Sequence, residues 1–462
     1  MTCKRLAISV VYLTHNNESN NPRCWDRWQG IQALPAEYLR GEIQQPRPSP
    51  ISSTNYHQTS TLTRMSATPK IFISAGEASG EHYGTLLIRA LRGLEPEADF
   101  FGLGGRRMEA LGFRPIVRAE DVAVMGITEV VRHLPRIYRE YRRLRRSIVE
   151  EKPDAAVLID FPDVNLSLAR RLKQQGVPVI YFVSPQLWAW KKYRVRSVQR
   201  HVDRMLTIFP FEERFYHDRG VEAEFVGHPL AESDPPRISR EEFARQAELD
   251  TSKTWVGLLP GSRGKEIRLN LPEMVRAAAM LGQDIEFLVP IAPMLTAPQR
   301  DHIRVLLAEL AAAEANPPRI ALVEDARAVL HHARASIVAS GTATVEAALI
   351  GNPFIVVYRI SPLSYAVAKR VVDVPHVAMV NLIAGKRIVP ELIQGDFTAD
   401  NVVSHLRPLL NNEDARARMQ ANLRQVGKML RSEQSSVGRV ARITCEMLKT
   451  RLTPEERQSH VP

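Results

Sequence analysis

From residue 70 onward, short β-branched and apolar segments alternate with longer segments of helical periodicity. Each apolar segment has the length and composition of a strand buried on both faces. This alternation is typical of parallel sheets assembled from βαβ units, so it predicts an α/β fold. The expected strands cover residues 155–159, 177–183, 205–209, 256–259, 285–289, 320–323, 336–339 and 354–358.

A proline-rich stretch at 233–237 interrupts the alternation, and the pattern then restarts. Such a break is typical of a domain boundary. We therefore expect two Rossmann-like domains, 67–233 and 234–400, with a cleft between them. Helical patterns over 401–452 and a tail at 453–462 complete the chain.

Residues 1–66 differ from the rest of the chain, because they cluster Asn, Ser, Thr and Pro and show little sustained periodicity. This composition predicts a disordered or dispensable extension. Met65 stands just before the strand-like segment at 69–74. We therefore expect the functional protein to begin near Met65.

The charge balance favours acidic partners. Lys and Arg number 62 against 51 Asp and Glu, a formal net charge of +11. Nucleic acid, an anionic membrane surface and phosphorylated substrates all fit this charge, but no nucleic-acid recognition motif is present and we expect no nucleic-acid partner. No apolar run approaches the roughly 18 residues that span a bilayer. The three cysteines are too scattered for a disulfide framework or a zinc site.

The first candidate site segment follows the expected strand at the start of the domain. It contains Gly76, Glu77, Ser79 and Gly80, and it leads into a helical pattern. Its glycines allow close backbone approach to a ligand, and its amides favour an anion or a sugar hydroxyl. A plain strand-to-helix turn explains the same residues equally well.

Two carboxylates, Asp160 and Asp163, follow the expected strand at 155–159. Open α/β sheets bind ligands at the carboxyl ends of their strands, where an Asp can act as a general base. Asp160 comes directly off the strand, so we expect it to be the catalytic base. Asp163 follows Pro162, and we expect it to cap the next helix.

Two further strand ends, in the second domain, suit a diphosphate. Gly261, Ser262 and Arg263 form a turn whose amides and guanidinium could contact phosphate oxygens, although the spacing is not that of a P-loop. Gly341 and Thr342 open a helix whose amino end could face the same group.

Glu346 lies farther along the helical pattern that Gly341 and Thr342 open, and its carboxylate could accept hydrogen bonds from ribose hydroxyls. The structural alternative makes Ser340 or Thr342 an N-cap and Glu346 a favourable first-turn charge. No Asp-x-Asp occurs, so we expect no metal to hold the diphosphate. His228 fits a structural role and a catalytic role equally well.

A basic helical pattern runs from residue 132 to residue 148. Apolar residues recur at steps of three and four, and arginines occupy most other positions. This pattern predicts either a helix lying on anionic lipid or a surface helix packed on the sheet. The candidate membrane residues are Arg139, Arg142, Arg143 and Arg146.

Taken in order, the motifs resemble those of the lipid-A-disaccharide synthase family, inverting glycosyltransferases of the GT-B type. The resemblance covers about residues 69–450. It rests on segments 75–80 (AGEASG), 124–127 (VMGI), 159–165 (IDFPDVN), 183–190 (VSPQLWAW), 209–212 (FPFE), 226–229 (VGHP), 259–263 (LPGSR), 340–342 (SGT) and 380–385 (VNLIAG).

The resemblance implies transfer of 2,3-diacylglucosamine from its UDP donor to 2,3-diacylglucosamine 1-phosphate, without metal or other cofactor. It implies that Asp160 is the base, Arg263 a diphosphate contact, Glu346 a donor-nucleotide contact and Asn381 a further active-site residue. Acylated substrates imply a cytoplasmic enzyme peripheral to the inner face of the cytoplasmic membrane. The alternatives are another GT-B enzyme acting on UDP-sugars, such as an epimerase or a cell-wall glycosyltransferase, and a non-catalytic lipid-binding protein.

Overall fold

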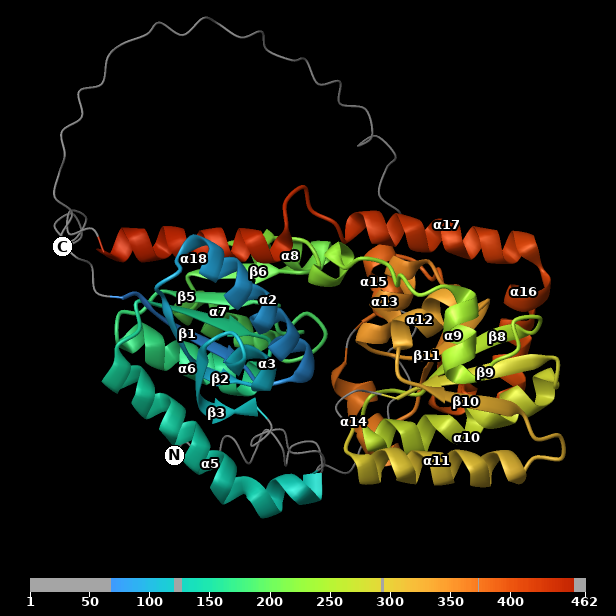
Figure 1. Ribbon diagram of the computed structural model, residues 1–462. Coiled ribbons are helices and arrows are strands. Elements are labelled where there is room, and N and C mark those ends of the chain that lie inside the picture. The colour runs from blue at the N-terminus through green and yellow to red at the C-terminus, as the bar shows by residue number, and fades with distance from the viewer. Residues whose placement is uncertain (1–67, 120–126, 292–294, 373, 453–462) are drawn as a thin grey trace, which may run out of the picture. The chain divides into compact units, whose positions relative to one another are not determined.

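A computed structural model describes residues 68–119, 127–291, 295–372 and 374–452 of the chain. The expected extension at 1–66, the tail at 453–462 and motif residues 124–126 lie outside these ranges. Within them the chain forms two sheets whose strands all pair in parallel (Figure 1). The α/β fold class predicted from the sequence is confirmed.

The first sheet has seven strands in the order β3-β2-β1-β4-β5-β6-β7. The expected strand at 155–159 coincides with β4, whereas the one at 205–209 ends early. Its last residue, Phe209, precedes Pro210, and proline suits the first position of a helix. The strands are β1 (Lys70–Ala75), β2 (Asp99–Gly104), β3 (Phe113–Arg118), β4 (Ala155–Ile159), β5 (Val179–Phe182), β6 (Arg204–Thr207) and β7 (Ala223–Phe225).

The second sheet has six strands in the order β10-β9-β8-β11-β12-β13. Five of them match expected strands to within two residues, and β13 is an additional short strand at the edge. The strands are β8 (Thr254–Leu259), β9 (Ile285–Pro290), β10 (Arg319–Val323), β11 (Ala335–Ala339), β12 (Phe354–Tyr358) and β13 (Glu391–Ile393).

Each sheet has one point at which the strand order reverses. In the first sheet it lies between β1 and β4, and in the second between β8 and β11. The connections that leave two such strands run in opposite directions, which opens a crevice at their carboxyl ends. The candidate site segments follow these four strands.

Helices cover both faces of the sheets (Figure 1). In the first half they are α2 (Ala78–Leu94), α3 (Arg106–Glu109), α5 (Ile127–Glu151), α6 (Pro162–Gln174), η2 (Lys192–Arg194), α7 (Val195–His201), α8 (Pro210–His217) and η3 (Pro229–Glu232). In the second half they are α9 (Arg240–Ala247), α10 (Gly264–Leu281), α11 (Ala297–Ala312), α12 (Ala326–His332), α13 (Thr342–Ile350), α14 (Pro362–Val371), α15 (Met379–Ala384) and η4 (Gln394–Asp396).

The C-terminal helices are divided between the two sheets. α16 (Ala399–Asn411) packs on α10, and α17 (Glu413–Met429) packs on α13. α18 (Ser436–Leu452) packs on α2 beside the first sheet. Arg439 of α18 forms an ion pair with Glu224 of β7, with Nε 2.7 Å from Oε1. Helix α18 therefore stabilises the first half of the fold.

Helix α5 packs the later part of its apolar stripe into the protein. Tyr141, Leu144 and Ile148 are buried in a core with residues of β1, β2 and β4. The part of this stripe from Tyr141 onward therefore serves the fold, as the surface-helix alternative expected, and is not free to enter lipid. Among the residues that the structure describes, no helix combines the length and the apolarity that crossing a membrane requires.

Candidate active site

The chain turns sharply after β4. Asp160 and Phe161 have φ values of +46° and +49°, a left-handed conformation that is uncommon for residues other than glycine. Two buried side chains hold this turn through the Asp160 carbonyl oxygen: Asn165 Nδ2 donates to it at 2.7 Å and the Tyr181 hydroxyl at 2.6 Å. The backbone of the candidate base is therefore fixed before any ligand binds.

The Asp160 carboxyl group has an unusual acidity. Burial, and to a smaller extent the charge of Glu77, raise its pKa to about 7, against the opposing effects of the Phe161 amide and the Arg263 guanidinium. A general base works best when its pKa lies near the operating pH. The environment of Asp160 therefore suits a group that takes and returns a proton near neutrality.

The turn after β1 lies against the turn after β4. A Cβ atom on Gly76 would lie 2.3 Å from the Phe161 ring, so only glycine permits this contact. Glu77 is the N-cap residue of α2, but its side chain makes no cap and its Oε2 lies 3.7 Å from Arg263 Nη2. Ser79 and Gly80 belong to the first turn of α2. The ion pair between Glu77 and Arg263 joins the reversal points of the two sheets.

The turn after β8 is occupied by a carboxylate of its own helix. Glu266 Oε2 accepts hydrogen bonds from the amides of Ser262 at 3.1 Å and Arg263 at 3.3 Å. Gly261 has a φ of +117°, and a Cβ there would lie 2.5 Å from the same Oε2. We had expected these amides to be donors for a diphosphate, but in this structure Glu266 accepts from both.

The turn after β11 is arranged differently. Gly341, rather than Ser340 or Thr342, is the N-cap residue of α13, and as a glycine it supplies no side-chain cap. Ser340 Oγ instead donates to the Val377 carbonyl at 3.3 Å. Gly341 and Thr342 are exposed. The amino end of α13 is therefore better suited to an anion than that of α10.

Glu346 lies in the second turn of α13, not the first. Its side chain is largely buried, its Oε1 lies 3.9 Å from Arg327 Nη1, and burial raises its pKa. The charges of Glu346 and Asp160 both act on the buried Tyr83 of α2. Glu346 is thus close enough to the first half to interact with it electrostatically.

Asn381 differs from the other candidates because its side chain is wholly buried. Its Nδ2 donates to the Val389 carbonyl at 3.0 Å and to Glu391 Oε1 at 2.7 Å. Its Oδ1 accepts from the amides of Ile388 at 2.7 Å and Val389 at 3.0 Å. This geometry does not support a direct substrate contact, because every polar position of the amide is used to hold segment 388–391.

Asp163 is not the helix cap that we expected. The N-cap residue of α6 is Phe161, and Asp163 lies within the first turn. Its Oδ1 instead lies 2.6 Å from Arg194 Nη2 and 4.0 Å from Lys191 Nζ. Asp163 therefore forms ion pairs with a segment distant in sequence and does not cap α6.

For His228 the geometry favours the structural alternative. Its ring is buried between Phe209 and Tyr83, and its Nδ1 accepts a hydrogen bond from the Leu230 amide at 3.1 Å. Burial lowers its pKa to about 3, so the ring is neutral at physiological pH.

Sequence reasoning missed two residues beside Arg263. Glu266 has the three-residue spacing from Arg263 at which an acidic residue reaches back to the turn, a signal that was available. Tyr358, at the end of β12, is influenced by the charges of both Glu266 and Arg263. Its proximity depends on the pairing of β11 with β12, which local spacing does not reveal.

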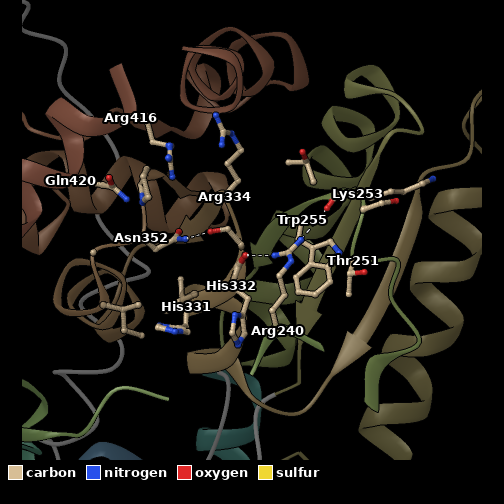
Figure 2. Close-up of a pocket in the computed structure, with 17 residues that line it drawn as sticks. Arg240, Thr251, Lys253, Trp255, His331, His332, Arg334, Asn352, Arg416 and Gln420 are labelled. Carbon is tan, nitrogen blue, oxygen red and sulfur yellow. Dashed lines mark hydrogen bonds between the residues drawn. The ribbon is translucent and has the colours of Figure 1, made fainter. Parts of the chain in front are cut away.

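A cavity of about 530 Å³ lies elsewhere in the second half, at the amino ends of β8, β11 and β12 (Figure 2). Its cations are already engaged. Arg240 lies 3.5 Å from the centre of the Trp255 ring, and Arg334 and Arg416 both contact Glu413. The candidate site residues follow the opposite, carboxyl ends of the strands. Among the described residues, no cluster of three or more His, Cys, Asp or Glu could hold a metal ion.

A known protein family matches most of the length of this chain. A family model described as lipid-A-disaccharide synthetase matches residues 71–444. A lipid-A-disaccharide synthase of Acidobacterium capsulatum is 66% identical over 393 residues, which are 84% of this chain and 98% of that protein.

Two solved structures share the fold at low sequence identity. The UDP-GlcNAc 2-epimerase from Neisseria meningitidis bound to UDP-GlcNAc has a TM-score of 0.51 at 11% identity, covering 82% of this chain and all (100%) of that one. The glycosyltransferase of kitacinnamycin has a TM-score of 0.52 at 14% identity, covering 83% and 100%. These likenesses show the two-sheet GT-B fold. Together with the family match, they establish that the chain belongs to the lipid-A-disaccharide synthetase family of GT-B glycosyltransferases.

Proposed function

We propose that this protein transfers 2,3-diacylglucosamine from its UDP donor to 2,3-diacylglucosamine 1-phosphate. The products are the β-1,6-linked disaccharide 1-phosphate and UDP. The observation that carries the proposal is the meeting of Asp160, Glu77 and Arg263 at the reversal points of the two sheets. A base from one half and a diphosphate contact from the other are the two groups that such a transfer needs.

In the proposed reaction the acceptor 6-hydroxyl oxygen attacks C1 of the donor sugar as its proton passes to the Asp160 carboxylate. The bond between C1 and the diphosphate oxygen breaks, and the configuration at C1 inverts. A positioned base contributes roughly a hundred- to ten-thousand-fold to such a step. The hydroxyl is otherwise a poor nucleophile at neutral pH.

UDP leaves with an additional negative charge on its diphosphate. The amino end of α13, at Gly341 and Thr342, offers backbone amides to that charge, and Arg263 offers a guanidinium. Glu346 would accept hydrogen bonds from the donor nucleotide. Donor binding would draw Arg263 away from Glu77 and Glu266, both within 3.7 Å of its guanidinium.

The alternative of a UDP-sugar epimerase rests on the shared fold alone, since the epimerase structure is 11% identical. The alternative of a non-catalytic lipid-binding protein does not account for the raised pKa of Asp160 beside an exposed arginine. Glycosyl transfer is therefore the function that these residues support best.

The direct test incubates the purified full chain with UDP-diacylglucosamine and diacylglucosamine 1-phosphate in neutral detergent. Mass spectrometry should detect the disaccharide 1-phosphate, with one UDP released per disaccharide. Conversion of the donor to its 2-epimer, or release of UDP without disaccharide, would contradict the proposal. Asp160→Asn is the matched inactive control.

We also propose that the enzyme is cytoplasmic and meets the inner face of the membrane through the basic surface of α5. Arg139, Arg142, Arg143 and Arg146 are exposed there, although Glu140 and Glu150 lie within 3.8 Å of three of them. Each basic residue near an anionic surface contributes about 1 kcal/mol. Replacing all four by Glu should therefore abolish most salt-sensitive binding to anionic vesicles. Unchanged sedimentation at low salt would exclude this surface as the contact.

A further inference from the structure

Two cations converge on a single carboxylate in the segment that follows β5. Arg194 Nη2 lies 2.6 Å from Asp163 Oδ1, and Lys191 Nζ lies 4.0 Å from the same oxygen. Both basic side chains are only 17% exposed, whereas Asp163 is 50% exposed. Lys191 and Arg194 are thus more enclosed than Asp163, whose carboxylate is accessible to solvent.

Lys191 and Arg194 share the Asp163 carboxylate. The charged groups that act on Lys191 are Asp163 and Arg194, and burial lowers the pKa of Lys191. Cations that are partly removed from water are stabilised by an anion that approaches them. A phosphate that reached Lys191 and Arg194 would therefore be bound favourably.

The local backbone also holds Lys191 in an unusual way. Its φ is +55°, a left-handed conformation that a lysine adopts at a cost. Its ammonium group lies 3.9 Å from the centre of the Trp190 ring, a cation–π contact. Strained residues persist where the surrounding structure enforces them, and they cluster at ligand sites. Lys191 is therefore held in place before a ligand arrives.

The position of the cluster relates it to the candidate base. β4 and β5 are neighbours in the first sheet, with Ile159 paired to Phe182. Asp160 follows β4 directly, Asp163 lies one turn later, and Lys191 and Arg194 lie in the connection after β5. The charges of Asp160, Asp163 and Arg194 all act on Tyr181. A sugar whose hydroxyl reached Asp160 could extend toward this cluster.

We propose that Lys191 and Arg194 form the subsite for the phosphate monoester of the acceptor. The inference rests on the proposed function, because it assigns the charged end of that acceptor to these two residues. Arg offers two parallel N–H donors to phosphate oxygens and Lys offers a point charge, the combination used for phosphate elsewhere. Asp163 holds the two cations in place until the phosphate engages them.

The test compares two acceptors, diacylglucosamine with and without its 1-phosphate, in neutral detergent that contains no phospholipid. Lys191→Met and Arg194→Gln should each lower kcat/KM for the phosphorylated acceptor about 10- to 100-fold, the range expected for lost hydrogen bonds to a charged group. For the acceptor without phosphate, kcat/KM should change less than about threefold, because its reaction never used these charges. The KM of the UDP donor should stay unchanged.

Lys173→Met is the matched control, since Lys173 forms an ion pair of similar length with Asp203 elsewhere in the first half. It should affect neither acceptor. Equal losses with both acceptors in the Lys191 and Arg194 variants would overturn the proposal and reduce these residues to a structural role. A raised donor KM would instead assign them to the diphosphate, which also overturns it. If the unaltered enzyme forms no disaccharide with either acceptor, the proposed function itself fails.

Discussion

The two reversal points of the sheets are arranged in different ways, although both follow the carboxyl ends of parallel strands. The turn after β4 uses non-glycine residues in left-handed conformations, and the buried Asn165 and Tyr181 hold it. The turn after β8 uses Gly261 and carries Arg263, whose side chain is 59% exposed. The first arrangement is rigid and partly desolvated, and the second is open. A proton transfer needs the former, and a diphosphate that must bind and leave needs the latter.

The two turns also differ in the conformational free energy that their backbones cost. A non-glycine residue in the left-handed region costs roughly 1–2 kcal/mol, so two consecutive residues there need compensating contacts. Asn165 supplies part of this, because its Nδ2 also lies 3.1 Å from the Ile159 carbonyl and its Oδ1 accepts from Ser74. Glycine avoids this cost after β8. The fold therefore concentrates its strain on the side of the base.

The largest effect should come from the rigid side. Asp160→Asn should lower turnover by roughly two to four orders of magnitude while leaving UDP affinity intact, because the base contacts the acceptor only. The folded-state pKa of about 7 lies above the usual value for Asp, so ionised Asp160 opposes folding at pH 8. The variant should accordingly unfold at a higher temperature than the parent at pH 8.

The control for this variant lies three residues farther along the same turn. Asp163→Asn should retain most of kcat, and any loss should appear in the KM of the phosphorylated acceptor, since Asp163 positions Arg194 and Lys191 and does not contact the reacting hydroxyl. Turnover and thermal unfolding of both variants measure the contrast. An active Asp160→Asn enzyme beside a folded but inactive Asp163→Asn enzyme would mean that the base has been assigned to the wrong carboxylate.

On the open side we expect a smaller effect of a different kind. Arg263→Ala should weaken UDP binding about 10- to 100-fold, the effect of losing charge-assisted hydrogen bonds worth about 1.5–3 kcal/mol. Arg263→Lys should restore only part of it, because a point charge does not reproduce a planar fork. Calorimetry with UDP measures both variants. Undiminished affinity in the Ala variant would assign Arg263 to its ion pairs with Glu77 and Glu266 instead.

Asn381 tests whether a buried residue in the second half acts on substrate or on the fold. Asn381→Ala would leave the amides of Ile388 and Val389 without their acceptor, so we expect a loss of about 2–4 kcal/mol in the free energy of unfolding. Turnover per folded molecule should stay near that of the parent. Denaturant unfolding and active-site titration separate the two quantities. Normal stability with lost turnover would restore the direct role that the family resemblance implied.

Much of the fold could be predicted because each strand is a local signal. The expected strands at 155–159 and 354–358 coincide with β4 and β12. Strand ends also indicated Asp160 and Arg263, since parallel sheets bind ligands at their carboxyl edges. The expected strand at 177–183 ends at Phe182 in the structure, because Val183 has a φ of +63° and is therefore not extended.

The contacts of the site could be predicted less well, because they join segments distant in sequence. Asp163 was expected to be a cap from its place after Pro162, but Arg194, 31 positions later, forms an ion pair with it. The ion pair between Glu77 and Arg263 joins the two halves, and neither sequence segment by itself indicates it. Local spacing predicts which residues stand at a sheet edge, whereas tertiary structure decides what they touch.

The smallest effect that we predict concerns the link between the two sides. Glu77 is the carboxylate whose charge raises the pKa of Asp160, and it also forms an ion pair with Arg263. The base acts as its carboxylate, so kcat/KM for the acceptor should fall as the pH drops through about 7. Glu77→Gln removes a negative charge, which favours ionisation of Asp160 and lowers its pKa. The acidic limb of the profile should therefore move to lower pH, by up to about one unit for a partly solvated neighbour.

The control is Glu81→Gln, which removes a carboxylate from the first turn of α2. The charge of Glu81 does not affect the pKa of Asp160, so this variant should leave the acidic limb in place. A limb that stays fixed in Glu77→Gln, or moves to higher pH, would show that the open side does not tune the base.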